Sequence, residues 1–166
     1  MSDRPVNVLF LCTHNSARSI LAEAVLNHIG KGRFMAFSAG SSPRNNQQPN
    51  PLALKVLGAA GIATDGLHSK SWDEFGAASA PQMDLVITVC DNAAGEVCPF
   101  WPGHPATAHW GYADPSVDEN SEEQKLEGFR KTLHAIRHRI DLLVNLPPHH
   151  LDKLVLQTSA RELARS

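Results

Sequence analysis

A cysteine stands at the junction between an apolar strand and a helix near the start of this chain. The strand is expected over 6–11 (V-N-V-L-F-L), because nearly all of its residues are apolar, as in a strand buried on both faces. Cys12 follows at once, and helical spacing of apolar residues runs from Ala17 to about Ile29. A strand that passes through a short loop into a helix is the start of a βαβ unit. This stretch therefore favours an α/β fold with a parallel sheet.

The rest of the chain continues the same alternation of strands and helices. Further strands are expected at 33–39, 83–89 and 106–110, and helices at about 51–60, 72–75 and 122–143. Right-handed crossovers then predict a small doubly wound, four-stranded parallel sheet of order 2-1-3-4 with helices on both faces. We expect one catalytic domain over 1–146. Pro147 and Pro148 separate it from a C-terminal extension, 147–166, that is expected to be helical.

Composition narrows the class of protein. The 166 residues carry a formal net charge of -2, which gives no reason to expect nucleic acid or an acidic membrane as a partner. No apolar run is long enough to span a bilayer or to resemble a secretory signal. Three cysteines, an odd number, argue against a disulfide framework. These features predict a cytoplasmic enzyme that binds neither nucleic acid nor membrane.

The loop C-T-H-N-S-A-R-S after the first strand predicts an oxyanion site. Its backbone N–H groups, the positive end of the following helix and the planar guanidinium of Arg18 can all face one tetrahedral anion. The residues expected to bind it are Thr13, His14, Asn15, Ser16, Ala17, Arg18 and Ser19. Such surroundings lower a thiol pKa, so Cys12 is expected to be a nucleophilic thiolate. The alternative is a buried structural cysteine at a strand end.

Two more cysteines follow the third expected strand. In a sheet of order 2-1-3-4 the first and third strands are neighbours, so Cys90 is expected close to Cys12 at the edge where ligands bind. Seven residues separate Cys90 from Cys98. The functional interpretation is a resolving pair for thiol–disulfide exchange, and the alternative is two inert core cysteines. With His104 or His109 the spacing lacks the short knuckle of zinc sites, so no metal is predicted.

Asp114 precedes Pro115 beyond the fourth expected strand. A carboxylic acid that faces the anion loop could protonate a leaving oxygen. An aspartate before proline is also common in turns. The presence of the Cys12 loop favours the acid.

Taken together, these motifs resemble the arsenate reductases built on the low-molecular-weight tyrosine phosphatase fold. The resemblance covers about 6–143. It is carried by C-T-H-N-S-A-R-S (12–19), S-A-G (38–40), V-I-T-V-C-D-N-A-A-G-E-V-C-P (86–99) and H-W-G-Y-A-D-P (109–115).

The resemblance implies a relay of three cysteines. Cys12 would attack arsenate held by the loop and Arg18, while Asp114 protonates the departing oxygen. Cys90 would then attack Cys12, which releases arsenite and leaves a disulfide. Cys98 would take over Cys90, and thioredoxin or glutathione with glutaredoxin would reduce the product. No bound cofactor is implied, and the chain is expected to be a monomer, with a dimer through its C-terminal extension as the alternative.

This sequence departs from the family pattern at two places. The gap between Cys90 and Cys98 is one residue longer than in thioredoxin-coupled members. Some members also bind potassium near the loop through an asparagine, a glutamate, a serine and an aspartate. Asn15, Glu23 and Ser38 match that set, but Ser71 stands at the aspartate position, so no potassium site is predicted.

Two other functions remain open on the residues alone. A tyrosine phosphatase would need only Cys12, Arg18 and Asp114, with water completing the cycle. Against it, Ser116 and Val117 follow Asp114-Pro115, where aromatic residues typically flank a phosphotyrosine ring. A non-catalytic module that binds phosphate or a metalloid is the other alternative. Reduction of arsenate needs two electrons and thus a second sulfur, which the extra cysteines could supply.

Overall fold

A computed structural model describes residues 5–12, 15, 17–41, 48–76, 82–89, 106–112, 115, 121–146, 158 and 160–164. Strands and helices alternate over 6–59, as the sequence predicts; beyond that, a further short helix and then two strands follow one another among the described elements. In chain order they are β1 (Val6–Cys12), α1 (Arg18–Ile29), β2 (Phe34–Gly40), α2 (Pro51–Ala59), α3 (Asp73–Gly76), β3 (Leu85–Thr88), β4 (Ala106–His109) and α5 (Glu122–Val144).

The four strands form one parallel sheet of order β2-β1-β3-β4, which confirms the predicted topology. In its register Cys12 lies opposite Gly40 on β2, and Leu11 lies opposite Thr88 on β3. The carboxyl ends of β1 and β3 are therefore level at the same edge of the sheet. The order changes direction at β1, so this edge is the point at which doubly wound folds bind ligands.

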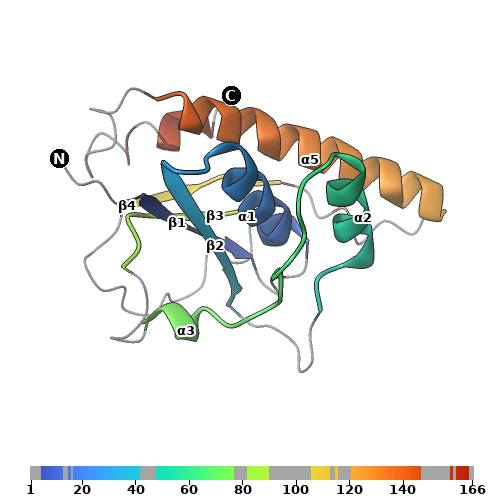
Figure 1. Ribbon diagram of the computed structural model, residues 1–166, viewed down its shortest axis with the longest axis horizontal. Helices are drawn as coiled ribbons and strands as arrows, with labels where there is room; N and C mark the ends of the chain where they lie inside the picture. The colour runs from blue at the N-terminus through green and yellow to red at the C-terminus, as the bar shows by residue number, and fades with distance from the viewer. Residues whose placement is uncertain are drawn as a thin grey trace.

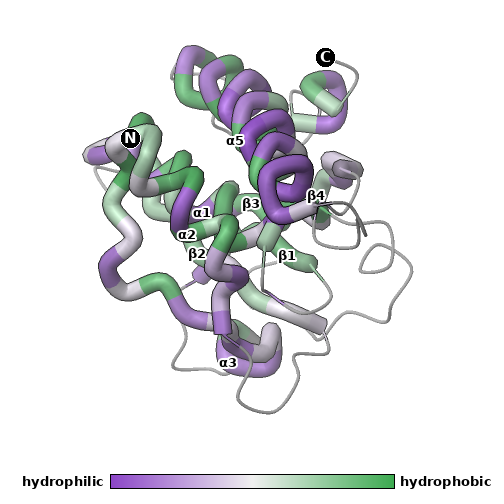
Figure 2. The backbone as a smooth tube through the Cα atoms, turned by 90° about the vertical axis from the view of Figure 1, so that its right-hand side faces the viewer, coloured by the Kyte–Doolittle hydropathy of each residue, from purple (hydrophilic) through white to green (hydrophobic). Residues whose placement is uncertain are grey.

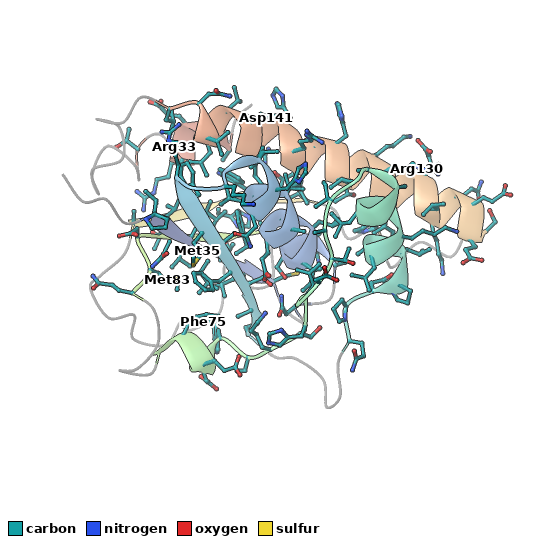
Figure 3. All side chains as sticks on the ribbon, viewed as in Figure 1. Arg33, Met35, Phe75, Met83, Arg130 and Asp141 are labelled. Carbon is teal, nitrogen blue, oxygen red and sulfur yellow. The ribbon has the colours of Figure 1, made fainter. Side chains whose placement is uncertain are left out.

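The two faces of the sheet carry two separate hydrophobic clusters. Val8 and Phe10 on β1 face a large cluster shared with α1, α2 and α5. Leu9 and Leu11, the alternate residues, face a smaller cluster with Phe75 and Met83 (Figure 3). Figures 1 and 2 show α1, α2 and α5 on one side of the sheet and α3 on the other. Helices thus cover both faces, and β1 is buried on both, which explains its nearly continuous apolar sequence.

Helix α5 shows most plainly how sequence sets the limits of an element. Ser121 accepts from the backbone N–H of Gln124 and Gln124 bonds back to the Ser121 N–H, so the helix begins with a capping box. Phe129, Leu133 and Ile136 are buried at a spacing of three or four residues. Hydrophilic and hydrophobic residues alternate along this helix, as Figure 2 shows. Burial of this apolar stripe fixes the helix across the body of the protein.

Part of the C-terminal extension packs on the domain. The indole Nε1 of Trp110 donates to the carbonyl of Ala160 at 2.8 Å, and Ala160 is fully buried. Arg139 on α5 donates to the carbonyl of Ala164 at 3.1 Å. The segment 160–164 is therefore held by Trp110, just after β4, and by Arg139 on α5. Both residues belong to the domain expected over 1–146.

The limits of the observed elements differ from the predicted ones by one or two residues. Strand β1 extends to Cys12, and β3 is shorter than the predicted 83–89. Gly30 caps α1 at its C-terminus, as a glycine after a helical pattern predicts. No helix in the described part of the chain has both the length and the apolar composition to cross a membrane.

Candidate active site

The sulfur-bearing residue of the predicted loop lies at the carboxyl end of β1. Cys12 is the last residue of that strand, is 4% exposed and is a thiol rather than part of a disulfide. Its carbonyl accepts from the N–H of Ser41 at 3.1 Å, just beyond β2. The backbone of Cys12 is thus fixed by the sheet, which orients the first residue of the loop.

Helix α1 begins close to Cys12 in the chain. Its first residue is Arg18, and the N-cap is Ala17. Among the described residues no side chain caps this end of the helix. The first N–H groups of a helix have no partner within the helix, and a helix start without a side-chain cap suits an anion as the acceptor.

Arg18 reaches across the sheet edge toward the segment after β4. Its Nη1 donates to the carbonyl of Tyr112 at 2.9 Å. The guanidinium of Arg139 lies over the Tyr112 ring, 4.8 Å from its centroid. Burial raises the pKa of Tyr112 to about 12, which keeps the phenol neutral at physiological pH. In sequence Tyr112 is two residues before Asp114, so Arg18 contacts the segment that leads to the predicted acid.

Asn15 is the residue that organises the middle of the loop. It is fully buried and adopts the left-handed conformation, with φ of 53°. Its amide Nδ2 donates to Ser19 Oγ at 2.8 Å and to Ser38 Oγ at 2.9 Å. Its Oδ1 accepts from the Lys70 N–H at 2.9 Å. The side chain therefore ties the loop to α1, β2 and the segment 68–71, and the Asn15 carbonyl accepts from Ser69 Oγ of the same segment at 2.6 Å.

A largely buried ion pair continues this network beyond Asn15. Ser38 Oγ donates to Glu23 Oε1 at 2.5 Å, and Glu23 Oε1 lies 3.8 Å from Lys70 Nζ. Burial raises the pKa of Glu23, and the Ser38 hydrogen bond and the Lys70 charge oppose that rise. Burial also lowers the pKa of Lys70, and the charges of Glu23 and Glu74 oppose this. Each group of the pair thus stabilises the charged form of the other.

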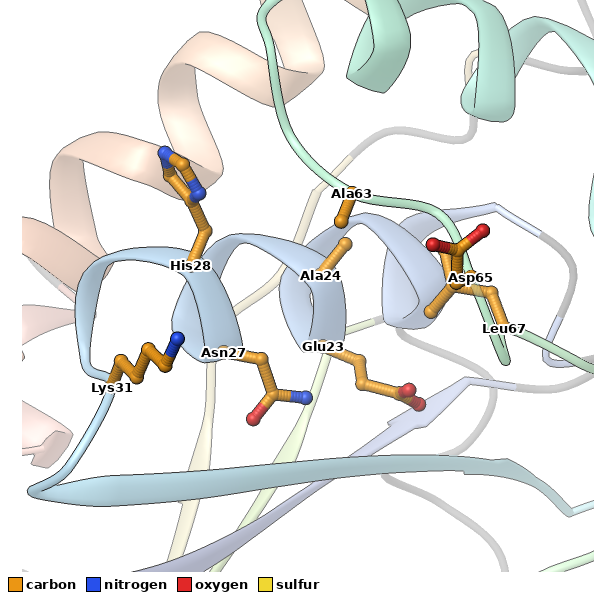
Figure 4. A pocket seen from close by; sticks show the side chains of 8 residues that line it. All are labelled: Glu23, Ala24, Asn27, His28, Lys31, Ala63, Asp65 and Leu67. Carbon is orange, nitrogen blue, oxygen red and sulfur yellow. The ribbon is translucent and has the colours of Figure 1, made fainter.

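A cavity of about 320 Å³ lies on the other side of Glu23. It is bounded by α1 and the segment 63–67, and its lining includes Glu23, Asn27, Lys31 and Asp65. Figure 4 shows Glu23 and Asn27 leaving α1 on the same side, toward β2. None of the loop residues that the structure describes lines this cavity.

The structure describes only some of the predicted site residues. It brings Asn15, Ala17, Arg18 and Ser19 to the end of β1, beside Cys12. The other predicted positions lie outside the described residues: Thr13, His14, Ser16, Cys90, Cys98 and Asp114. Val89, which precedes Cys90, donates its N–H to the carbonyl of Leu11 at 2.8 Å. The described segment 82–89 therefore ends beside β1, one residue before Cys90.

Lys70 and Tyr112 contact predicted site residues, and sequence reasoning did not select them. Lys70 lies in an irregular polar stretch with no periodicity, and Tyr112 contributes its backbone carbonyl to Arg18 rather than its side chain. A backbone contact leaves no signal in residue type. Within the described residues no group of three or more histidine, cysteine, aspartate or glutamate side chains is placed to bind a metal.

The bonds of Asn15 predict how its substitution changes stability. We expect Asn15→Ala to lower the free energy of unfolding by about 2–4 kcal/mol, because buried partners lose their hydrogen bonds. Asn15→Gly should lower the free energy of unfolding by about 1 kcal/mol less than Asn15→Ala does, since glycine adopts positive φ without strain. Urea denaturation of both variants measures the difference. If the alanine variant is as stable as the glycine variant, the left-handed conformation is not a strained one.

Comparison with known proteins identifies the class to which this fold and site belong. Residues 7–157 match the family described as low molecular weight phosphotyrosine protein phosphatase. The chain belongs to this family, and it is an enzyme.

Within the family, the similar proteins of known name include arsenate reductases. An arsenate reductase of Bacillus licheniformis is 36% identical over 134 residues, which cover 80% of this chain and 91% of that protein. A solved structure described as an arsenate reductase in the phosphate binding state superposes with a TM-score of 0.67. The two chains are 27% identical, and the match covers 84% of this chain and 96% of that one.

A phosphatase shares the same fold. The low molecular weight protein tyrosine phosphatase of T. tengcongensis gives a TM-score of 0.65 at 24% identity, over 84% of this chain and 97% of that chain. At that identity the likeness concerns the architecture alone. Fold therefore does not separate reductase from phosphatase, and the separation depends on the site residues.

Proposed function

We propose that this protein is an arsenate reductase that converts arsenate to arsenite through Cys12. The observation that carries the proposal is the buried Cys12 thiol at the carboxyl end of β1, followed by a loop fixed through Asn15 and by the start of α1. The identity to arsenate reductases supports it. Arsenical resistance and detoxification would be its role, in a reducing compartment such as the cytoplasm, where thiols persist.

The first step of the proposed mechanism is capture of the oxyanion. Backbone N–H groups of 13–19 and the guanidinium of Arg18 would hold the arsenate oxygens around the Cys12 sulfur. The same groups would stabilise the thiolate. The Cys12 sulfur then attacks arsenic, and an oxygen leaves as water after it takes a proton from Asp114. The bond from Arg18 to the Tyr112 carbonyl supports this role, since it ties Arg18 to the segment before Asp114.

The second step transfers two electrons to arsenic. The Cys90 thiolate would attack the Cys12 sulfur, which forms a disulfide and breaks the arsenic–sulfur bond. The electron pair of that bond stays on arsenic, so arsenite leaves as the reduced product. The level ends of β1 and β3 support this step. Cys90 directly follows Val89, whose N–H donates a hydrogen bond to the carbonyl of Leu11, the residue before Cys12.

The third step regenerates the thiolate. Cys98 would attack Cys90, which leaves a disulfide between Cys90 and Cys98 and frees Cys12. A thiol donor then supplies two electrons and reduces this disulfide, from one dithiol or from two monothiol molecules. We propose thioredoxin, or glutathione with glutaredoxin, as the donor, with no bound cofactor and with a monomer as the working form.

Arsenate-dependent oxidation of NADPH tests this proposal when two donor systems are compared. One contains thioredoxin and its reductase, and the other contains glutathione, glutaredoxin and glutathione reductase. We expect turnover with at least one system and its loss in Cys90→Ser. Turnover with thioredoxin would place the disulfide between Cys90 and Cys98. Turnover with the glutathione system but not with thioredoxin would place the disulfide between the protein and glutathione. Cys98 would then be accessory.

The phosphatase is the second candidate, because the family that matches residues 7–157 is described by that activity. It predicts rapid hydrolysis of an aryl phosphate that does not depend on Cys90. Such hydrolysis, together with no arsenate-dependent NADPH oxidation in either system, would contradict the reductase.

A further inference from the structure

The ammonium group of Lys70 is almost buried beside the loop that follows Cys12. Its side chain is 11% exposed, and that of Glu23, its partner, is 14% exposed. Nζ donates to the carbonyls of Ser38 at 2.9 Å and of His68 at 2.8 Å. Carboxylate and carbonyl oxygens are also the ligands that metal cations of the main groups prefer. In this protein a lysine supplies the positive charge among them.

The hydrogen bonds from Asn15 to Glu23 run in one direction. The Asn15 Nδ2 group is a donor, so Ser38 Oγ must accept a hydrogen bond from it. The Ser38 hydroxyl then donates its own hydrogen bond to Glu23. A carboxylate is the better acceptor when it is ionised. A protonated Glu23 would carry an O–H donor that competes with Asn15 for Ser38 Oγ. The ionised form of Glu23 is therefore the better acceptor for the Ser38 hydroxyl, whose other side accepts from Asn15.

We propose that Lys70 is a positioning residue for the anion-binding loop, in which its ammonium acts as an internal cation. It keeps Glu23 ionised and thereby holds Asn15 in the conformation that shapes the loop. This inference rests on the proposed function, because it takes the loop to be the anion site. Burial raises the pKa of Glu23, so loss of the Lys70 charge would favour the protonated carboxyl.

Among the described residues, two other titratable side chains act on the pair. The charges of Lys70 and His68 lower the pKa of Glu23, which lies on α1. The charges of Glu23 and of Glu74, near the start of α3, raise the pKa of Lys70. Lys70 holds Asn15 by its backbone as well, through the bond from its N–H to Asn15 Oδ1. A substitution at Lys70 keeps that backbone bond, so it tests the side-chain charge.

Three variants separate the charge of Lys70 from its bulk. Lys70→Ala removes the charge and leaves space, whereas Lys70→Met removes the charge and fills the space. Lys31→Ala is the matched control: Lys31 is exposed, lines the cavity beside Glu23 and follows the end of α1. Phosphate affinity by calorimetry is the first readout. The second is the pH dependence of Cys12 alkylation by iodoacetamide, with the modified cysteine located by mass spectrometry.

We expect both Lys70 variants to bind phosphate about tenfold more weakly than the wild type and the Lys31 control, as loss of a charge-supported contact implies. The midpoint of Cys12 alkylation should rise by about one pH unit. Ammonium chloride should restore phosphate binding in Lys70→Ala but not in Lys70→Met. Tetramethylammonium chloride at the same ionic strength should restore neither, since it is too large for the space.

Wild-type affinity and alkylation in both Lys70 variants would overturn the inference. A loss in Lys70→Ala that ammonium does not restore would overturn it too, because the stem and not the charge would then matter. If Lys70→Ala does not fold, Lys70→Met decides alone: unchanged binding and alkylation contradict the inference. A wild-type protein that binds no phosphate and alkylates as an ordinary thiol would contradict the proposed function itself, whatever the Lys70 variants do.

Discussion

Replacing Cys12 with serine is expected to abolish arsenate-dependent turnover, with kcat falling by about 10⁴-fold or more. The serine hydroxyl stays protonated at neutral pH and is a poor nucleophile, whereas a thiolate is ready to attack. Serine also forms no disulfide, so the electron transfer to arsenic has no route. The NADPH-coupled assay with both donor systems measures this loss.

The fold should tolerate this substitution. Cys12 ends β1 and its backbone bond to Ser41 does not involve the sulfur, so serine changes one atom in a site of fixed geometry. We expect the variant to bind phosphate within a few-fold of the wild type. A Cys12→Ser variant that keeps a measurable share of wild-type turnover would show that another group is the nucleophile.

Arg18→Lys is expected to lower kcat/KM for arsenate by about 10²–10³-fold. An ammonium is a point charge and cannot hold two oxygens in a planar fork as a guanidinium does. Lysine also lacks the planar group through which Arg18 Nη1 donates to the Tyr112 carbonyl. Steady-state kinetics with arsenate, and calorimetry with phosphate, measure the two effects.

Arg130→Lys is the matched control for this change. Arg130 lies on α5 with its side chain 57% exposed, paired with Glu127 at 3.4 Å (Figure 3). We expect no change in kinetics there, because an exposed pair within one helix contributes little. If Arg18→Lys kept near-wild-type affinity for phosphate, the role assigned to Arg18 would be wrong.

The sequence predicted the architecture because its strongest signals are buried. A strand such as β1 must be apolar on both faces, and α5 must present a stripe at helical spacing, so both patterns are visible without coordinates. The order of the strands followed from the handedness of crossovers. The prediction of Cys12 and Arg18 as neighbours of a helix start relied on the same geometry.

The supporting contacts were beyond such reasoning. Sequence spacing could not show that Asn15 turns its side chain inward to Ser38. Nor could it show that Lys70, 55 positions later, donates its N–H to the Asn15 side chain and its ammonium to the Ser38 carbonyl. These contacts join segments far apart in the chain through polar residues without periodicity, so tertiary structure is needed to find them.

The most direct test of the central claim is a single turnover without any external reductant. Fully reduced protein is mixed with excess arsenate, arsenite is quantified per chain, and disulfides are located by mass spectrometry. The proposed relay predicts one arsenite per chain and one disulfide among Cys12, Cys90 and Cys98, since arsenic gains the two electrons that the thiols lose. No arsenite, with all three thiols intact, would contradict it.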